Sequence, residues 1–222
     1  MDWNRYVTAQ AIRNGGYDLR RAPAPVRGWF RSGFEIARRL RPLRVRPAAV
    51  TTLGLALAGL VPLLATRGPA GLLAAAAAVL LSSFAGTLAG VLDLLGPEPG
   101  SLRRAIWQEA AGRLTEAAWL AGFWTSGVPG PLVVACGTLT GLHALVRDRA
   151  LAAGASRLGA QTIAEHPMRV SVSVAGLALA GLAGAAGAPL ESGVLTVAAA
   201  AWLLLALLGA GQLAEVVHKT LP

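Results

Sequence analysis

The stretch from Gly86 to Gly122 reads GTLAGVLDLLGPEPGSLRRAIWQEAAGRLTEAAWLAG. It consists of two largely apolar segments separated by the turn GPEPG, whose Pro and Gly residues interrupt a helix. Each segment continues outward into an apolar run long enough for a transmembrane helix, which needs about 20 residues. The same pattern recurs along the chain and predicts an all-α, polytopic membrane protein with six transmembrane helices, at 48–66, 71–95, 104–127, 131–149, 169–187 and 193–217.

The composition also indicates a membrane protein. Of the 222 residues, 55% are hydrophobic and only 14% are charged, whereas a soluble domain carries about 25% charged residues. Eleven of the 20 Lys and Arg residues lie in the first 46 positions, directly before the first apolar run. Such clusters face anionic lipid head groups more often than nucleic acid, so we expect membrane lipids and no nucleic acid as partners. The chain divides into a basic cytoplasmic or interfacial segment, 1–46, and a six-helix membrane domain, 47–222.

The basic residues also predict the orientation, because cytoplasmic loops carry an excess of Lys and Arg. If the N-terminus is cytoplasmic, six spans leave only Arg67 in a loop on the far side. We therefore expect a multi-pass protein of the cell (inner) membrane with both termini cytoplasmic. Besides the N-terminal cluster, the cytoplasmic side then receives Arg103, Arg104, Arg147, Arg149, Arg157, Arg169 and Lys219.

The segment before the first span has the pattern of an amphipathic helix. Arg residues cover much of the face opposite an apolar stripe that includes a Trp, which is typical of a helix lying in the head-group plane. We therefore expect an N-terminal interfacial helix, with a cytoplasmic helix packed on its own protein as the alternative. The stripe has helical spacing and consists of Val26, Trp29, Phe30, Phe34, Ala37 and Leu40.

The stretch from Gly86 to Gly122 resembles the signature of the CDP-alcohol phosphatidyltransferase family of integral membrane phospholipid synthases. That signature is Asp-x-x-Asp-Gly-x-x-Ala-Arg, eight or nine residues, and then Gly-x-x-x-Asp-x-x-x-Asp. Gly90 fits its first glycine, and the sequence RLTE at 113–116 is similar to the Arg-Leu-Ser-Asp that often ends it. In this register, however, the four aspartate positions hold Gly86, Ala89, Gln108 and Gly112.

Three further segments are similar to the same family. RVRPAAVTTLGL at 44–55 resembles the Pro-Asn-x-x-Thr stretch that opens the first span, with the Thr kept. LVRDRALAAG at 145–154 and GAQTIAEHPMRV at 159–170 resemble segments of actinobacterial members whose basic residues help to bind the phosphate of the acceptor. Ordinary positive-inside bias would also place basic residues there. The lipid- or phosphate-binding residues that the resemblance implies are Thr51, Arg147, Arg149, His166 and Arg169.

The resemblance implies a six-helix enzyme, usually a homodimer, that transfers a phosphatidyl group from a CDP-linked lipid to an alcohol and releases CMP. Its four aspartates hold two divalent metals, Mg²⁺ or Mn²⁺. Three of the replacements here offer no side-chain oxygen, and losing even one oriented charge costs about 3–4 kcal/mol of transition-state stabilisation. We therefore expect a pseudoenzyme without a metal cofactor. It would act as a lipid-binding partner or regulator, either as a homodimer or as a heteromer with an active homologue.

Two other hypotheses remain at the level of sequence. A divergent but active transferase would use relocated acids, namely Asp93, Glu109 and Glu116, if they converge on one cytoplasm-facing cavity. Against this, Glu109 and Glu116 lie four and three residues from Arg113, the spacing at which side chains pair along a helix. The third hypothesis is an unrelated six-helix channel or transporter. Inverted repeats or helices interrupted within the bilayer would favour it, and neither is clear in this sequence.

Overall fold

The computed structural model describes residues 1–13, 18–96, 101–153 and 166–220. Within these residues the chain is all-α, as predicted, with eight α-helices and one short 3₁₀ turn, η1, at Arg41–Leu43. The helices are α1 (Trp3–Arg13), α2 (Ala24–Leu40), α3 (Pro47–Ala65), α4 (Gly68–Leu95), α5 (Leu102–Thr125), α6 (Gly130–Ala152), α7 (His166–Ala185) and α8 (Glu191–Thr220).

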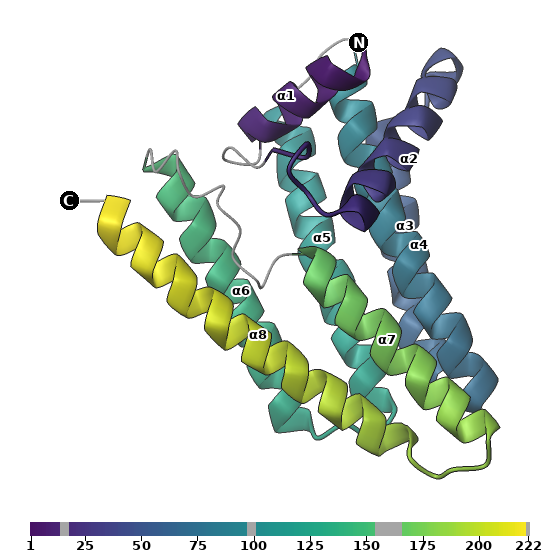
Figure 1. Cartoon of the computed structure of the whole chain (residues 1–222). Helices are drawn as coiled ribbons and strands as arrows, with labels where there is room; N and C mark the ends of the chain where they lie inside the picture. The colour runs from purple at the N-terminus through teal and green to yellow at the C-terminus, as the bar shows by residue number, and fades with distance from the viewer. Residues whose placement is uncertain (14–17, 97–100, 154–165, 221–222) are drawn as a thin grey trace.

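The six helices α3 to α8 lie where the sequence predicts six spans. They run back and forth through the molecule, and α1 and the end of α8 lie toward the same end (Figure 1). Among the described residues, α3, α4, α6, α7 and α8 are long and apolar enough to cross a membrane. The α5 helix is more polar than its neighbours, since it carries charged residues at five positions: Arg103, Arg104, Glu109, Arg113 and Glu116. The chain is therefore a polytopic membrane protein with five candidate spans.

The larger hydrophobic core lies among helices α3 to α8. Its bulkiest members are the aromatic side chains of Trp119, Phe123 and Trp202, which are almost fully buried. Both indole N–H groups have partners, because Trp119 donates to Ser82 Oγ over 3.1 Å and Trp202 donates to Thr140 Oγ1 over 3.0 Å. A buried Trp normally finds such a partner. The first bond links α5 to α4, and the second links α8 to α6.

A second core joins α1 and α2 to the C-terminal half of α4. The rings of Trp3, Tyr6 and Phe34 pack with centroids 5.2–5.5 Å apart. Burial raises the pKa of the Tyr6 phenol, so this cluster stays uncharged. On the same side of α2, Trp29 packs edge-on against Phe84 and donates to Thr87 Oγ1 over 2.9 Å.

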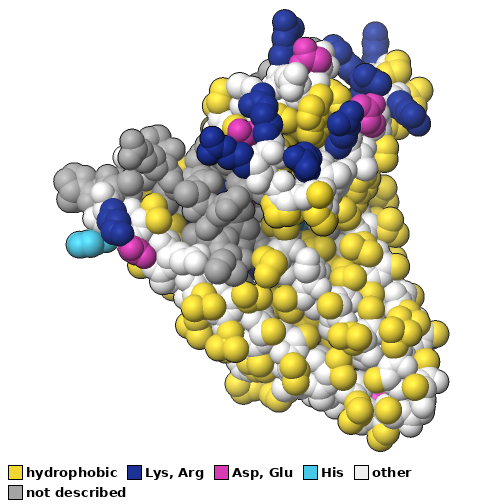
Figure 2. All heavy atoms as spheres, viewed as in Figure 1, with side chains coloured by type: hydrophobic (Ala, Val, Ile, Leu, Met, Phe, Trp, Pro, Cys, Tyr) yellow, Lys and Arg dark blue, Asp and Glu magenta, His cyan; other side chains and the backbone are white. Residues whose placement is uncertain are grey.

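The apolar stripe of α2 thus packs against the chain itself. None of its six residues is exposed, and Phe34 and Ala37 are buried. This matches the alternative that the sequence left open, a helix packed on its own protein. Its Arg residues point outward instead. Most of the Lys and Arg side chains visible in Figure 2 gather at the end of the molecule that holds α1 and α2, and hydrophobic side chains are abundant over the remainder of this face.

Small residues allow the helices to approach closely, as they do in many membrane proteins, and Gly71 gives a direct test. A Cβ at Gly71 would overlap the carbonyl oxygen of Leu64 and lie 2.7 Å from Arg67 Cβ, whereas a Cβ at Gly90 of the same helix meets nothing within 4 Å. We expect Gly71→Ala to lower the free energy of unfolding by about 1–3 kcal/mol. Gly90→Ala should be neutral or raise it by about 0.5–1 kcal/mol. Thermal unfolding in detergent measures both, and equal effects would contradict the close contact.

Candidate functional site

The four positions aligned with the signature aspartates lie on α4 and α5. Ala89 is fully buried, whereas Gly86 and Gly112 are exposed, and a Cβ added at either glycine would meet nothing within 4 Å. Gln108 alone among the four has a side-chain oxygen. Its Oε1 accepts a hydrogen bond of 2.7 Å from an Nη of Arg13, the last residue of α1.

Asp93 lies one turn beyond Ala89, where α4 ends. Its side chain is fully buried between two guanidinium groups, with Oδ2 3.1 Å from an Nη of Arg13 and Oδ1 2.7 Å from Nε of Arg104. Arg13 therefore bridges α4 and α5, because it contacts Asp93 on one helix and Gln108 on the other. We call Arg13, Asp93, Arg104 and Gln108 the Asp93 cluster. Two cations already neutralise its single carboxylate.

These residues do not fit a divalent metal. Mg²⁺ and Mn²⁺ prefer several oxygen ligands, mostly carboxylates, and the Asp93 cluster offers one carboxylate that two arginines already occupy. Within the described residues, no group of three or more His, Cys, Asp or Glu side chains is arranged to hold a metal ion. A dication would also be repelled by the guanidinium groups of Arg13 and Arg104.

A cavity of about 620 Å³ is lined mainly by residues of α2, α4, α5, α6 and α7, with Gln10 added from α1. Its walls differ in character. The residues from α2 are apolar and include Trp29, and Leu80 of α4 and Val174 of α7 add apolar surface, whereas α5 and α6 contribute most of the charged groups. Those charged groups are Glu109, Arg113, Glu116, Arg147 and Asp148, with Arg169 added from α7. The cavity is therefore amphipathic and carries both signs of charge.

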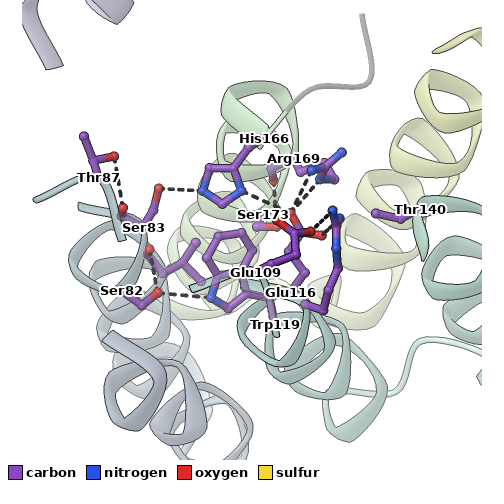
Figure 3. A network of polar contacts seen from close by, with 12 residues as sticks. Ser82, Ser83, Thr87, Glu109, Glu116, Trp119, Thr140, His166, Arg169 and Ser173 are labelled. Carbon is purple, nitrogen blue, oxygen red and sulfur yellow. Dashed lines mark hydrogen bonds and ion pairs between the residues drawn. The ribbon is translucent and has the colours of Figure 1, made fainter. Parts of the chain in front are cut away.

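Glu116 is the centre of the polar network in this cavity (Figure 3). Its side chain is 7% exposed, and its Oε1 lies 2.8 Å from Arg169 and 3.1 Å from His166 Nδ1. Arg113 lies 3.7 Å from Oε2 and also pairs with Glu109, one turn back on α5. Both ion pairs that the spacing within α5 predicts are therefore present. The contacts of Glu116 with His166 and Arg169 hold α5 against the beginning of α7.

Ser83, His166 and Glu116 form a chain of contacts whose order matches that of a serine hydrolase relay. The Ser83 Oγ lies 3.2 Å from His166 Nε2, and His166 Nδ1 lies 3.1 Å from Glu116. Acyl transfer also needs donors aimed at the developing oxyanion. Ser83 lies in the middle of α4, where backbone N–H groups bond within the helix. The backbone around Ser83 therefore offers no donors for an oxyanion, and we assign these contacts a structural role in joining α4 and α5 to α7.

The structure brings together only part of the predicted site. The predicted binding residues Arg147, His166 and Arg169 line the cavity, as do Glu109 and Glu116. Asp93 does not, because its side chain turns to Arg13 and Arg104 instead, so the three relocated acids do not converge on one cavity.

Two predicted binding residues also lie outside the set that lines the cavity. Thr51 is buried in α3, where its hydroxyl donates to the Pro47 carbonyl oxygen of its own helix over 3.1 Å. Arg149 is exposed on α6. Arg157, which the sequence places on the same cytoplasmic side, lies outside the described residues.

Sequence reasoning missed two residues that shape this region. Arg13 was one of eleven N-terminal basic residues with nothing to distinguish it, and its partner Asp93 is 80 positions away. Asp148 had a usable signal, since it is an acid placed between Arg147 and Arg149 in a segment otherwise notable for its basic residues. The role of Arg13, by contrast, follows only from the placement of α1 beside α4 and α5.

Comparison with known proteins identifies the fold. No protein-family model and no curated protein matches the sequence. Two crystal structures of the phosphatidylinositol phosphate synthase PgsA1 of Mycobacterium tuberculosis are similar. One, with CDP-DAG bound, has a TM-score of 0.65 and 21% identity over 86% of this chain and 96% of that chain. The other, in complex with manganese and citrate, has a TM-score of 0.66 and 22% identity over 85% and 90%. The chain therefore has the fold of PgsA1, a membrane-embedded CDP-alcohol phosphatidyltransferase.

Proposed function

We propose that this chain is a catalytically inactive relative of the CDP-alcohol phosphatidyltransferases that binds a membrane lipid and acts as a partner or regulator of an active phospholipid synthase. The observation that carries the proposal is the Asp93 cluster. The Arg13 guanidinium joins Asp93 on α4 to Gln108 on α5, in the region where the family resemblance implies a pair of divalent metals.

The chemistry supports inactivity. Transfer of a phosphatidyl group requires stabilisation of the charge that develops on phosphate oxygens, which Mg²⁺ or Mn²⁺ supplies in this family. At the aligned positions this chain has Gly86, Ala89 and Gly112 without side-chain oxygens, and Gln108 bonded to Arg13. The family cofactor is accordingly not part of our proposal.

The cavity supports lipid binding. An amphiphile needs apolar and polar surface in the same space, and the cavity is lined by apolar residues such as Trp29, Leu80 and Val174 together with the charged residues of α5 and α6. Its volume of about 620 Å³ is typical of small-molecule pockets, which range from about 300 to 1,000 Å³. PgsA1 was crystallised with the amphiphile CDP-DAG, which favours a lipid in the corresponding space here.

The proposal includes a membrane topology. All six helices from α3 to α8 would cross the inner membrane, with the charged residues of α5 facing the bundle interior, where intramembrane charges normally lie. Both termini would be cytoplasmic, which agrees with the basic residues around α1 and α2 (Figure 2). The α2 helix, whose apolar stripe packs on the protein itself, would turn its exposed arginines toward anionic head groups at the cytoplasmic surface. A homodimer, or a heteromer with an active homologue, is the proposed assembly.

Release of CMP tests the proposal directly. We expect the purified protein in lipid nanodiscs to release no CMP above a protein-free control. It would be supplied with CDP-diacylglycerol, Mn²⁺ and a pool of inositol phosphate, glycerol phosphate and serine. PgsA1, assayed in parallel, is the positive control. Metal-dependent release that is lost in Asp93→Ala or Glu109→Ala would overturn the proposal and favour a divergent transferase with relocated acids.

A further inference from the structure

The cavity is lined by equal numbers of arginine and carboxylate side chains. A site built only to bind phosphate would have an excess of positive charge. Three guanidinium groups face three carboxylates there, namely Arg113, Arg147 and Arg169 against Glu109, Glu116 and Asp148. The resemblance led us to expect basic residues that bind a phosphate. The observed balance indicates a ligand of a different charge type.

Most of these charges are satisfied within the protein. Arg113 pairs with Glu109, and Arg169 contacts Glu116 over 2.8 Å. Arg147 and Asp148 differ from the others, because in the part of the chain that the structure describes neither forms a side-chain hydrogen bond or an ion pair within 4 Å. Asp148 interacts only at longer range with its surroundings, namely with Glu109, Arg113 and Arg147. Arg147 and Asp148 are consecutive residues of α6, and both line the cavity. The protein thus presents one positive and one negative group side by side.

Charged groups next to a membrane normally pair with a partner of opposite charge. A head group with a phosphate and an ammonium group provides one partner for each of these two side chains. A purely anionic head group would satisfy Arg147 but would place negative charge next to Asp148 and near Glu109. A purely cationic one would fail in the converse way at Arg147. The two carboxylates thus add a penalty against the wrong ligand, which is a common source of specificity.

We propose that the cavity binds a zwitterionic phospholipid, with its phosphate at Arg147 and its ammonium group at Asp148. The first part of its hydrocarbon chains would lie against the apolar wall that includes Trp29 and Val174. This inference rests on the proposed lipid binding and specifies the head group. It does not depend on whether the protein retains any transferase activity.

The test uses nanodiscs that contain equal amounts of phosphatidylethanolamine and phosphatidylglycerol. The full-length protein is extracted in detergent and gel-filtered, and the lipids that stay bound are quantified by mass spectrometry. We expect phosphatidylethanolamine to be enriched about fivefold over phosphatidylglycerol, the effect of one partly exposed charge pair. Asp148→Asn should abolish or reverse this preference, and Arg147→Gln should reduce the retention of both lipids. Arg149→Gln, which changes an exposed neighbour outside the cavity, should leave the ratio and the amount unchanged.

The outcomes separate this inference from the proposed function. If the wild-type protein retains no more lipid than Arg147→Gln and an unrelated membrane protein, lipid binding in the cavity fails, and both proposals fall. If lipid is retained but the two head groups are equally represented, or Asp148→Asn keeps the wild-type ratio, only the zwitterionic assignment is overturned. Gel-filtration profiles and helical content that match the wild type establish that each variant is folded.

Discussion

Replacing both Arg13 and Arg104 with alanine should lower the free energy of unfolding by roughly 3–5 kcal/mol, the usual cost of leaving a buried charge without its partner. The Asp93 side chain is fully buried and contacts Arg13 at 3.1 Å and Arg104 at 2.7 Å. The double variant would leave this carboxylate enclosed at the end of α4 with neither guanidinium. Thermal or denaturant unfolding in detergent, followed by tryptophan fluorescence, measures the loss.

Removal of the two arginines should cost more stability than removal of the carboxylate, because Asp93 is more deeply buried than its partners. This difference supplies the control variants. The Arg13 and Arg104 side chains are each 30% exposed, so they can reach water when the carboxylate is removed, and Asp93→Ala should cost less than the double arginine variant. Adding Asp93→Asn to that variant should restore part of the stability. Arg5→Ala removes an exposed ion pair with Asp2 and should change stability by less than about 1 kcal/mol. A double variant no less stable than Arg5→Ala would contradict the role of the Asp93 cluster.

Glu116→Ala should have an effect of similar size, again roughly 3–5 kcal/mol. One substitution removes the carboxylate that contacts Arg169, His166 and Arg113 together. Arg169 is only 12% exposed and would lose this partner inside the bundle. Since Glu116 holds α5 to the beginning of α7 beside the cavity, we also expect the variant to retain less lipid. Unfolding and lipid retention can be measured on one preparation.

Two further variants serve as controls for Glu116→Ala, one at the same position and one at an exposed ion pair. Glu116→Gln keeps an oxygen that can accept a hydrogen bond from Arg169, so its loss of stability should be intermediate. Glu215→Ala breaks an exposed ion pair with Lys219 near the end of α8 and should cost less than about 1 kcal/mol. If Glu116→Ala were no worse than Glu215→Ala, the network in Figure 3 would contribute little to the fold.

Most of the fold could be predicted from the sequence because apolar runs and turn signals are local. The segment predicted at 104–127, for example, is the helix Leu102–Thr125. The α1 helix, Trp3–Arg13, was not predicted, since it is polar overall and short for an independently stable helix. Its stability comes from packing of Trp3 and Tyr6 against Phe34 of α2. That contact exists only in the folded chain.

In the candidate site, too, contacts within one helix could be predicted from the sequence, and contacts between distant segments could not. The pairing of Glu109 and Glu116 with Arg113 follows from helix geometry and could be derived from spacing alone. The partners of Asp93 could not, because Arg13 comes from a separate helix 80 residues earlier. Nor does spacing reveal that Arg147 and Asp148 face the same cavity as Glu116. Contacts between distant segments require the placed helices.

The two partners of Asp93 imply an order of events during synthesis. Arg104 lies 11 residues from Asp93 and Arg13 lies 80 residues from it, and contacts over short chain separations form faster. The local pair would therefore form first, when α4 and the beginning of α5 have left the ribosome. The N-terminal helix, although made earliest, would dock last and complete the shielding of the carboxylate. The α1 helix is thus present from the start of synthesis, but it can contact Asp93 and Gln108 only after α4 and the beginning of α5 have been made.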